Sequence, residues 1–167
     1  MLFQYISMLL FALFVSYPLS ARAQALEPLP DLTVDTLAYQ MTRCSAFYSA
    51  MHSLISEELM KFQDQETETR LRRILKQTEK NSDGLLLSST IVRTVLENKS
   101  DRDAVDEALD SRNGMIPKYL GALSSQSLGL GDSLESQLWA NDGAACYALV
   151  EQVEPIIERL TSSSTRR

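Results

Sequence analysis

The chain contains two cysteines, Cys44 and Cys146, and each lies on the apolar side of a segment with helical periodicity. In residues 35–62 the apolar side chains recur at intervals of three and four, which is typical of a helix that packs against other helices. These positions are Leu37, Met41, Cys44, Tyr48, Met51 and Ile55. The other side of this helix, which we expect to face water, carries Ser45, Ser49, Ser53 and Ser56. A disulfide between the two cysteines would make the first and last helical segments neighbours.

Three further segments show helical periodicity, and no segment alternates apolar and polar residues as a strand would. They cover residues 66–97, 101–123 and 132–160. The sequence Asn-Ser-Asp-Gly at residues 81–84 interrupts the first of them, and the pattern favours one long, disturbed helix over two shorter helices. Pro117 and Pro155 predict kinks in the other two segments, because proline lacks the N–H that the helical hydrogen bond needs.

Four helical segments with short connections predict an all-α fold, an up-down four-helix bundle with kinked helices. In this topology the first and last helices are antiparallel neighbours, so a Cys44–Cys146 disulfide would link them. Residues 35–160 then form a single helical-bundle domain. Residues 24–34, which include two prolines, are predicted to form an extended N-terminal arm, and residues 161–167 a disordered polar tail.

Residues 1–23 have the features of a removable export signal. An apolar run from Met1 to Leu19 is followed by Ala-Arg-Ala at residues 21–23, which is a small-x-small cleavage pattern. No lysine or arginine precedes the run, and the alternative is an uncleaved membrane anchor of barely sufficient length. We expect cleavage before Gln24, and therefore a periplasmic or secreted protein whose two cysteines are oxidised to a disulfide.

The charge of the chain limits its partners. Arg22 is the one charged residue in the first 23, so the cleaved chain would keep 15 basic and 22 acidic residues, a net charge of −7. Nucleic-acid binding needs a basic surface, which this charge disfavours. It also disfavours anionic membrane surfaces. We expect no nucleic-acid partner and no stable membrane insertion after cleavage.

Catalytic and metal-binding patterns are missing from the sequence. Hydrolysis by Ser-His-Asp or Cys-His needs a positioned base, and His52 is the only histidine. Di-iron bundles need Glu-x-x-His on two helices, a pattern that this chain does not contain. We therefore expect a protein that is not an enzyme and holds no cofactor. The alternative is a haem- or copper-binding bundle that uses His52 and a methionine such as Met41 or Met51.

Large apolar side chains lie in and near the Ser/Gly-rich stretch 124–131, where they suit the role of interface anchors. They are Leu128, Leu130, Trp139 and Tyr147. For Trp139 the alternative is packing over the end of the bundle. The leading hypothesis is an exported helical bundle that binds a protein partner without catalysis, such as an immunity or inhibitor protein or an envelope-assembly factor. A structural protein of unknown role is a further alternative.

Overall fold

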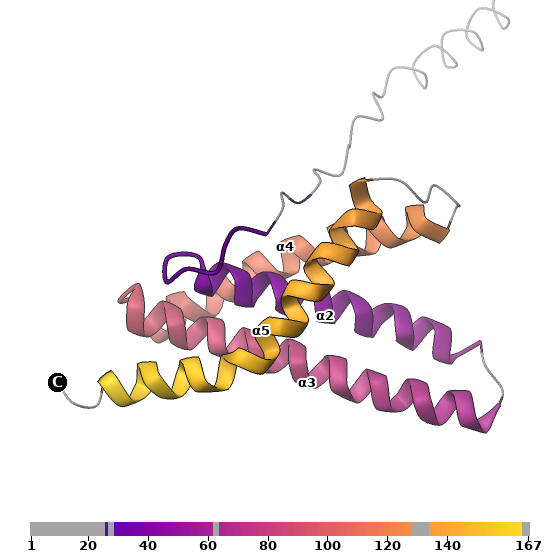
Figure 1. Cartoon of the computed structure of the whole chain (residues 1–167), viewed down its shortest axis with the longest axis horizontal. Helices are drawn as coiled ribbons and strands as arrows, with labels where there is room; N and C mark the ends of the chain where they lie inside the picture. Colours follow the sequence, from indigo (N-terminus) through magenta and orange to yellow (C-terminus); the bar gives the residue numbers. More distant parts are fainter. Residues whose placement is uncertain (1–25, 27–28, 62–63, 128–133, 165–167) are drawn as a thin grey trace, which may run out of the picture.

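A computed structural model of the chain describes residues 26, 29–61, 64–127 and 134–164. Four helices make up most of this part, and no strand occurs among these residues. They are α2 (Leu37–Leu59), α3 (Gln65–Leu96), α4 (Asp101–Ser127) and α5 (Leu134–Ser164). The helices alternate in direction along the chain (Figure 1), and a Cys44–Cys146 disulfide joins α2 to α5. The predicted all-α, up-down four-helix bundle with this disulfide is confirmed.

Helix α2 lies at the centre of the bundle and contacts the three other helices. Its residues from Leu37 to Tyr48 are buried, except for the half-buried Tyr39. The most extensive contact of α2 is with α3, whereas its contact with α5 is the smallest. Figure 1 shows why: α3 runs alongside α2, while α5 crosses both helices at an angle. The disulfide therefore lies at a crossing point and not along a continuous helix–helix seam.

Small polar residues fill the contact between α2 and α3. The hydroxyl oxygens of Thr42 and Ser89 are 2.6 Å apart. Further along α2, Ser45 donates a hydrogen bond of 2.8 Å to the carbonyl oxygen of Ser82, and the hydroxyls of Ser49 and Ser82 are 2.7 Å apart. The prediction that the serine side of this helix faces water is therefore wrong for Ser45 and Ser49. Small side chains let the two helices approach closely, and their hydroxyls then bond across the contact.

Helix α3 runs without a break through residues 81–84, so the single long helix that the pattern favoured is confirmed. Asp64 is the N-cap of this helix, because its carboxylate accepts a hydrogen bond of 2.8 Å from the backbone N–H of Thr67. Ser82 points into the seam with α2, and Leu85 is buried in the core. Gly84 is different, because it is exposed and a Cβ atom added there would have no neighbour within 4 Å.

The substitution Gly84→Ala is expected to raise the free energy of unfolding by about 0.5–1 kcal/mol, because alanine loses less backbone entropy in a helix interior. Urea denaturation of the two proteins measures the difference. Gly143→Ala is the matched control, because a Cβ atom at Gly143 would lie 3.3 Å from Cζ of Phe47. A smaller gain or a loss is expected there, and equal gains at both positions would contradict the close packing of α5 on α2.

Helix α5 is also continuous through residues 141–143, a point that the sequence left open. Pro155 lies inside it and cannot donate a hydrogen bond to the carbonyl of Glu151. Figure 1 shows the helix changing direction in its second half, as the predicted kink requires. The helix continues to Ser164, so the prediction of a tail that is disordered from residue 161 is wrong for residues 161–164. Residues 1–23 and 165–167 lie outside the described residues.

Candidate functional site

The two cysteines form a buried covalent link. Their sulfur atoms are 2.04 Å apart, their Cα atoms are 5.2 Å apart, and neither residue is exposed to solvent. A disulfide of this kind fits a protein that folds in an oxidising compartment. Because both thiols are bonded to each other, neither is available as a nucleophile or as a metal ligand.

A buried polar cluster lies beside the disulfide. The guanidinium of Arg43 in α2 donates two hydrogen bonds to the carboxylate of Asp142 in α5, from Nε to Oδ2 at 2.9 Å and from Nη2 to Oδ1 at 3.0 Å. The hydroxyl of Tyr119 in α4 donates to the same carboxylate and accepts a hydrogen bond of 3.2 Å from Nε of Arg43. The side chains of Arg43 and Asp142 are 0% and 1% exposed. Helices α2, α4 and α5 therefore meet at one bidentate ion pair.

Within this cluster, the surroundings raise the pKa of both Arg43 and Tyr119. Burial raises the pKa of Tyr119, and the hydrogen bond and negative charge of Asp142 raise it further. Burial alone would lower the pKa of Arg43, but its contacts with Tyr119, Tyr39 and Asp142 raise it above its ordinary value. Arg43 therefore stays charged and Tyr119 stays neutral. Because the three side chains are shielded from solvent, we assign the cluster to the architecture of the bundle and not to ligand binding.

The candidate interface residues fall into three groups. Leu128 and Leu130 lie outside the described residues. Trp139 is half-buried, its ring centre is 4.6 Å from that of Phe47, and its indole N–H donates a 3.1 Å hydrogen bond to the carbonyl oxygen of Tyr119. These contacts match the alternative in which Trp139 packs on the bundle. Tyr147 is 66% exposed. The use of any of these residues at an interface stays a prediction.

His52 lies half-buried on α2. In the described part of the chain, no group of three or more His, Cys, Asp or Glu side chains is arranged to hold a metal ion. The alternative of a haem or copper site at His52 therefore gains no support from neighbouring ligands of these types. None of the described helices combines the length and the apolar character needed to cross a bilayer.

A scan against protein-family models, a search of curated proteins and a search of solved structures each find no match to this chain. Inferences about its function therefore depend on its own surfaces. Apart from a smaller apolar hollow of about 280 Å³ between α3 and α4, lined in part by Leu87 and Val105, two apolar surfaces lie at opposite ends of the bundle.

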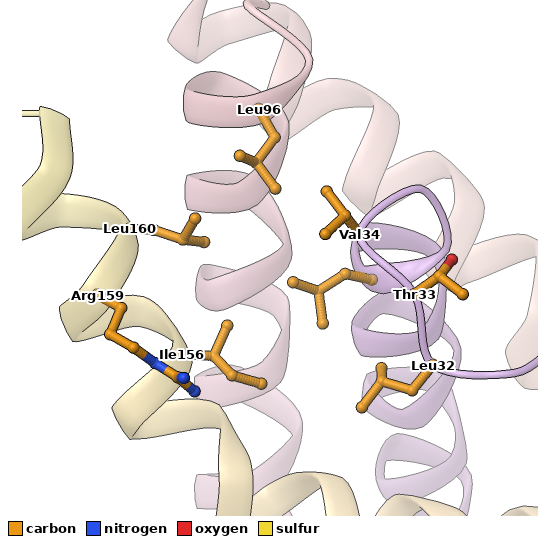
Figure 2. Close-up of a pocket in the computed structure, with 8 residues that line it drawn as sticks. Leu32, Thr33, Val34, Leu96, Ile156, Arg159 and Leu160 are labelled. Carbon is orange, nitrogen blue, oxygen red and sulfur yellow. The ribbon is translucent and has the colours of Figure 1, made fainter.

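The first is an open groove between the N-terminal arm and the ends of α3 and α5 (Figure 2). Its volume is about 530 Å³. Its lining consists of aliphatic side chains with one hydroxyl and one cation, namely Leu32, Thr33, Val34, Leu37, Leu96, Ile156, Arg159 and Leu160. Hydrogen bonds hold the arm in place, because Gln40 donates to the carbonyl oxygen of Pro30 at 2.6 Å and Thr36 donates to that of Asp31 at 2.7 Å.

The second surface is the end of the α2–α3 hairpin, formed by residues 54–60 and 65–75, which we call the hairpin end. The hydrophobic core extends along α2 only as far as Met51. Beyond it, six aliphatic side chains are only half-buried and lie outside the core, namely Leu54, Ile55, Leu59, Leu71, Ile74 and Leu75. Met60, at the C-terminal end of α2, is 82% exposed. Two helices alone cannot cover all of their apolar faces, and in the described part of the chain no third helix brings these side chains into the hydrophobic core.

Positive charge is concentrated next to this apolar face. Residues 70–80 of α3 contain five cations and one anion, although the whole chain is acidic. Arg72 pairs with Glu68 at 2.7 Å. The other four cations make no ion pair with any described residue, and they are Arg70, Arg73, Lys76 and Lys80. Arg70 and Arg73 also line a surface hollow of about 620 Å³ near the start of α3.

Sequence reasoning missed both surfaces, although a signal for one of them was present. The cations at residues 70–80 can be counted in the sequence. Their meaning depends on where the bundle ends, because the same apolar pattern would be buried if α4 and α5 covered it. The groove has no signal in the sequence, since the arm, α3 and α5 contribute its walls from distant parts of the chain.

Proposed function

We propose that this chain is an exported helical-bundle protein that acts without catalysis, by binding a protein partner at the hairpin end. The observation that carries the proposal is the half-buried aliphatic face of the hairpin end, which is flanked by cations that make no ion pair with any described residue. Contiguous apolar surface rimmed by polar residues is typical of interaction sites. The apolar signal-like run and the buried disulfide support export, because disulfides persist in oxidising compartments.

The chemistry of the hairpin end favours an amphipathic helix with acidic residues. A third helix laid against two others can insert its apolar side chains between them, as in helix-in-groove recognition. Arg70 precedes Ile74 by one helical turn, so the cation and the apolar residue lie on the same face. Carboxylates at the edge of the partner helix would meet Arg70 and Arg73, which have no ion-pair partner among the described residues. A partner helix gains both the apolar contact and the attraction to the arginines only if it carries an apolar face and carboxylates at the edge of that face.

An anionic membrane is less suited to this end. The residues closest to the tip include four carboxylates, those of Glu57, Glu58, Asp64 and Glu66, which anionic lipids would repel. Among them lies one cation, Lys61, which pairs with Glu58, and the other cations begin at Arg70, further along α3. A partner helix can place its own charges to match this pattern, whereas a membrane surface cannot.

Site-specific photo-crosslinking in the cells that make the protein tests this proposal. A photoreactive phenylalanine in place of Ile74 is expected to trap one partner protein, and the trapped chain isolated from the envelope should begin at Gln24. The same residue in place of Leu87, which is exposed on the same helix outside the hairpin end, is the matched control and should trap none.

Charge reversal makes the result specific to the proposed chemistry. Arg70→Glu together with Arg73→Glu should abolish trapping from position 74, because two attractive contacts become repulsive. Arg102→Glu, at an exposed position on α4, controls for the general change in charge and should leave trapping unchanged. Trapping that survives the double reversal, or that is equally strong from position 87, would refute binding at the hairpin end. Mass spectrometry of the trapped product should locate the crosslink in an acidic amphipathic helix.

A further inference from the structure

The groove at the opposite end of the bundle is built differently from the hairpin end. Its walls come from the arm, from Leu37 at the start of α2, from the last turn of α3 and from the last turns of α5 (Figure 2). Figure 2 shows Leu96 at the top of the view, Leu32 and Val34 on one side, and Ile156 and Leu160 on the other. Its volume of about 530 Å³ lies within the range of about 300–1,000 Å³ that is typical of sites for small molecules.

The chemistry of the lining restricts the ligand. The apolar side chains that line the groove in the described part of the chain are aliphatic, and none of them offers an aromatic ring to stack on a planar ligand. The hydroxyl of Thr33 already lies 3.1 Å from that of Thr36, in the turn that ends the arm. Among the described residues that line the groove, Arg159 is the one with a charged side chain. A ligand that matches this lining has a flexible aliphatic body and a single anionic group.

Arg159 is positioned to receive such an anionic group. Its Nε donates a 3.0 Å hydrogen bond to the carbonyl oxygen of Pro155, one turn earlier on α5, which holds the side chain along the helix. Its terminal nitrogens make no hydrogen bond or ion pair with any described residue. In Figure 2 the guanidinium lies beside Ile156 at the edge of the cavity. Carboxylate binding by a guanidinium at the rim would leave the aliphatic body over the leucines.

We propose that this groove binds a single free fatty acid, with its acyl chain along the aliphatic lining and its carboxylate at Arg159. Each methylene removed from water contributes about 0.8 kcal/mol, so a partly covered acyl chain gains binding free energy even in an open groove. The site lies at the other end of the bundle from the hairpin end and does not depend on the protein-binding proposal.

The test uses the chain from Gln24 with its disulfide formed and cis-parinaric acid as a fluorescent fatty acid. Its emission should rise on binding, and palmitate should displace it more effectively than the neutral hexadecanol. Arg159→Gln should weaken palmitate by about 2–5-fold, the range for an exposed ion pair, and leave hexadecanol unchanged. Equal displacement by palmitate and hexadecanol, before and after this substitution, would overturn the assignment of Arg159.

A second pair of variants tests the aliphatic lining. Leu96→Asp places a carboxylate in the groove and should weaken both ligands by at least about tenfold, because it adds a polar group that binding would desolvate. Leu87→Asp is the matched control, since Leu87 is an exposed leucine of the same helix that lies outside this groove. Equal effects of the two variants would overturn the site. Circular dichroism checks that each variant is folded. If Leu96→Asp does not fold, Arg159→Gln, at an exposed position, still tests the site.

The remaining arms separate the proposed occupant from other occupants. Vesicles of phosphatidylglycerol offer an anionic membrane surface in place of a free chain, and co-sedimentation with them without displacement of cis-parinaric acid by palmitate would overturn the proposal. Sedimentation velocity reports on a second copy of the chain. A dimer that Leu96→Asp disrupts, in a protein that does not bind cis-parinaric acid, would assign the groove to self-association and would equally overturn the fatty-acid site.

Discussion

Reduction of the Cys44–Cys146 disulfide is expected to lower the free energy of unfolding by about 2–5 kcal/mol. The bond closes a loop across a sequence separation of 102 residues. In the chain-entropy account, opening a loop of about this length returns conformational entropy to the unfolded chain, which lowers the free energy of the unfolded state by up to ~4.7 kcal/mol. The contact between α2 and α5 is otherwise the smallest between any two helices of the bundle. After reduction the Arg43–Asp142 ion pair still joins α2 to α5, but it does not restrict the unfolded chain as the covalent bond does.

Urea denaturation with and without reductant measures this effect. Cys44→Ala should match the reduced protein, and the additional change Cys146→Ala should cost little more, because both substitutions remove the same bond. Hydrogen exchange adds a spatial test, since reduction should increase exchange in α5 more than in the α2–α3 pair, which keeps its hydroxyl contacts. A protein isolated from an oxidising compartment with two titratable thiols would contradict the bond itself.

The bundle and its disulfide were predictable because their signals are local. The apolar positions of the first segment alone define a helix with one buried side, and a chain with two cysteines offers a single pairing. Turn-forming sequences were less informative. Asn-Ser-Asp-Gly at residues 81–84 and Asn-Asp-Gly at residues 141–143 favour turns locally, yet both lie inside continuous helices. In each case packing overrides the propensity, because Ser82 and Asp142 bond to α2.

Contacts between residues of different helices could not be predicted from the sequence of either helix alone. Ser45 and Ser49 look like solvent-facing residues until α3 supplies Ser82 opposite them. Arg43 and Asp142 look like surface charges on two separate helices, because charged residues are almost never fully buried unless they are paired. Their pairing is visible only once the bundle is assembled. The groove and the hairpin end depend in the same way on where neighbouring helices stop.

The Arg43–Asp142 pair carries the second large prediction. Asp142→Ala is expected to lower the free energy of unfolding by about 3–5 kcal/mol, because it leaves the guanidinium of Arg43 buried without its counter-charge. The effect should be seen as a lower urea midpoint with the disulfide intact. Asp106→Ala is the matched control, since Asp106 lies 3.8 Å from Arg102 on the exposed face of α4, where an ion pair contributes less than about 1 kcal/mol.

A double substitution separates two quantities: the destabilisation caused by leaving one buried charge without its counter-charge, and the net contribution of the ion pair to the free energy of unfolding. Arg43→Met combined with Asp142→Leu removes both charges and refills most of the volume, so it should be much more stable than Asp142→Ala. Tyr119→Phe added to this protein should be nearly neutral, because its hydroxyl has then lost the carboxylate that accepts its hydrogen bond. If the double variant is no more stable than Asp142→Ala, the cost lies in packing around the aromatic rings of Phe47, Tyr119 and Trp139. If the double variant recovers stability but no longer adopts a single native arrangement, the ion pair determines how α5 crosses α2. The reason is that only one register of the two helices joins Arg43 to Asp142.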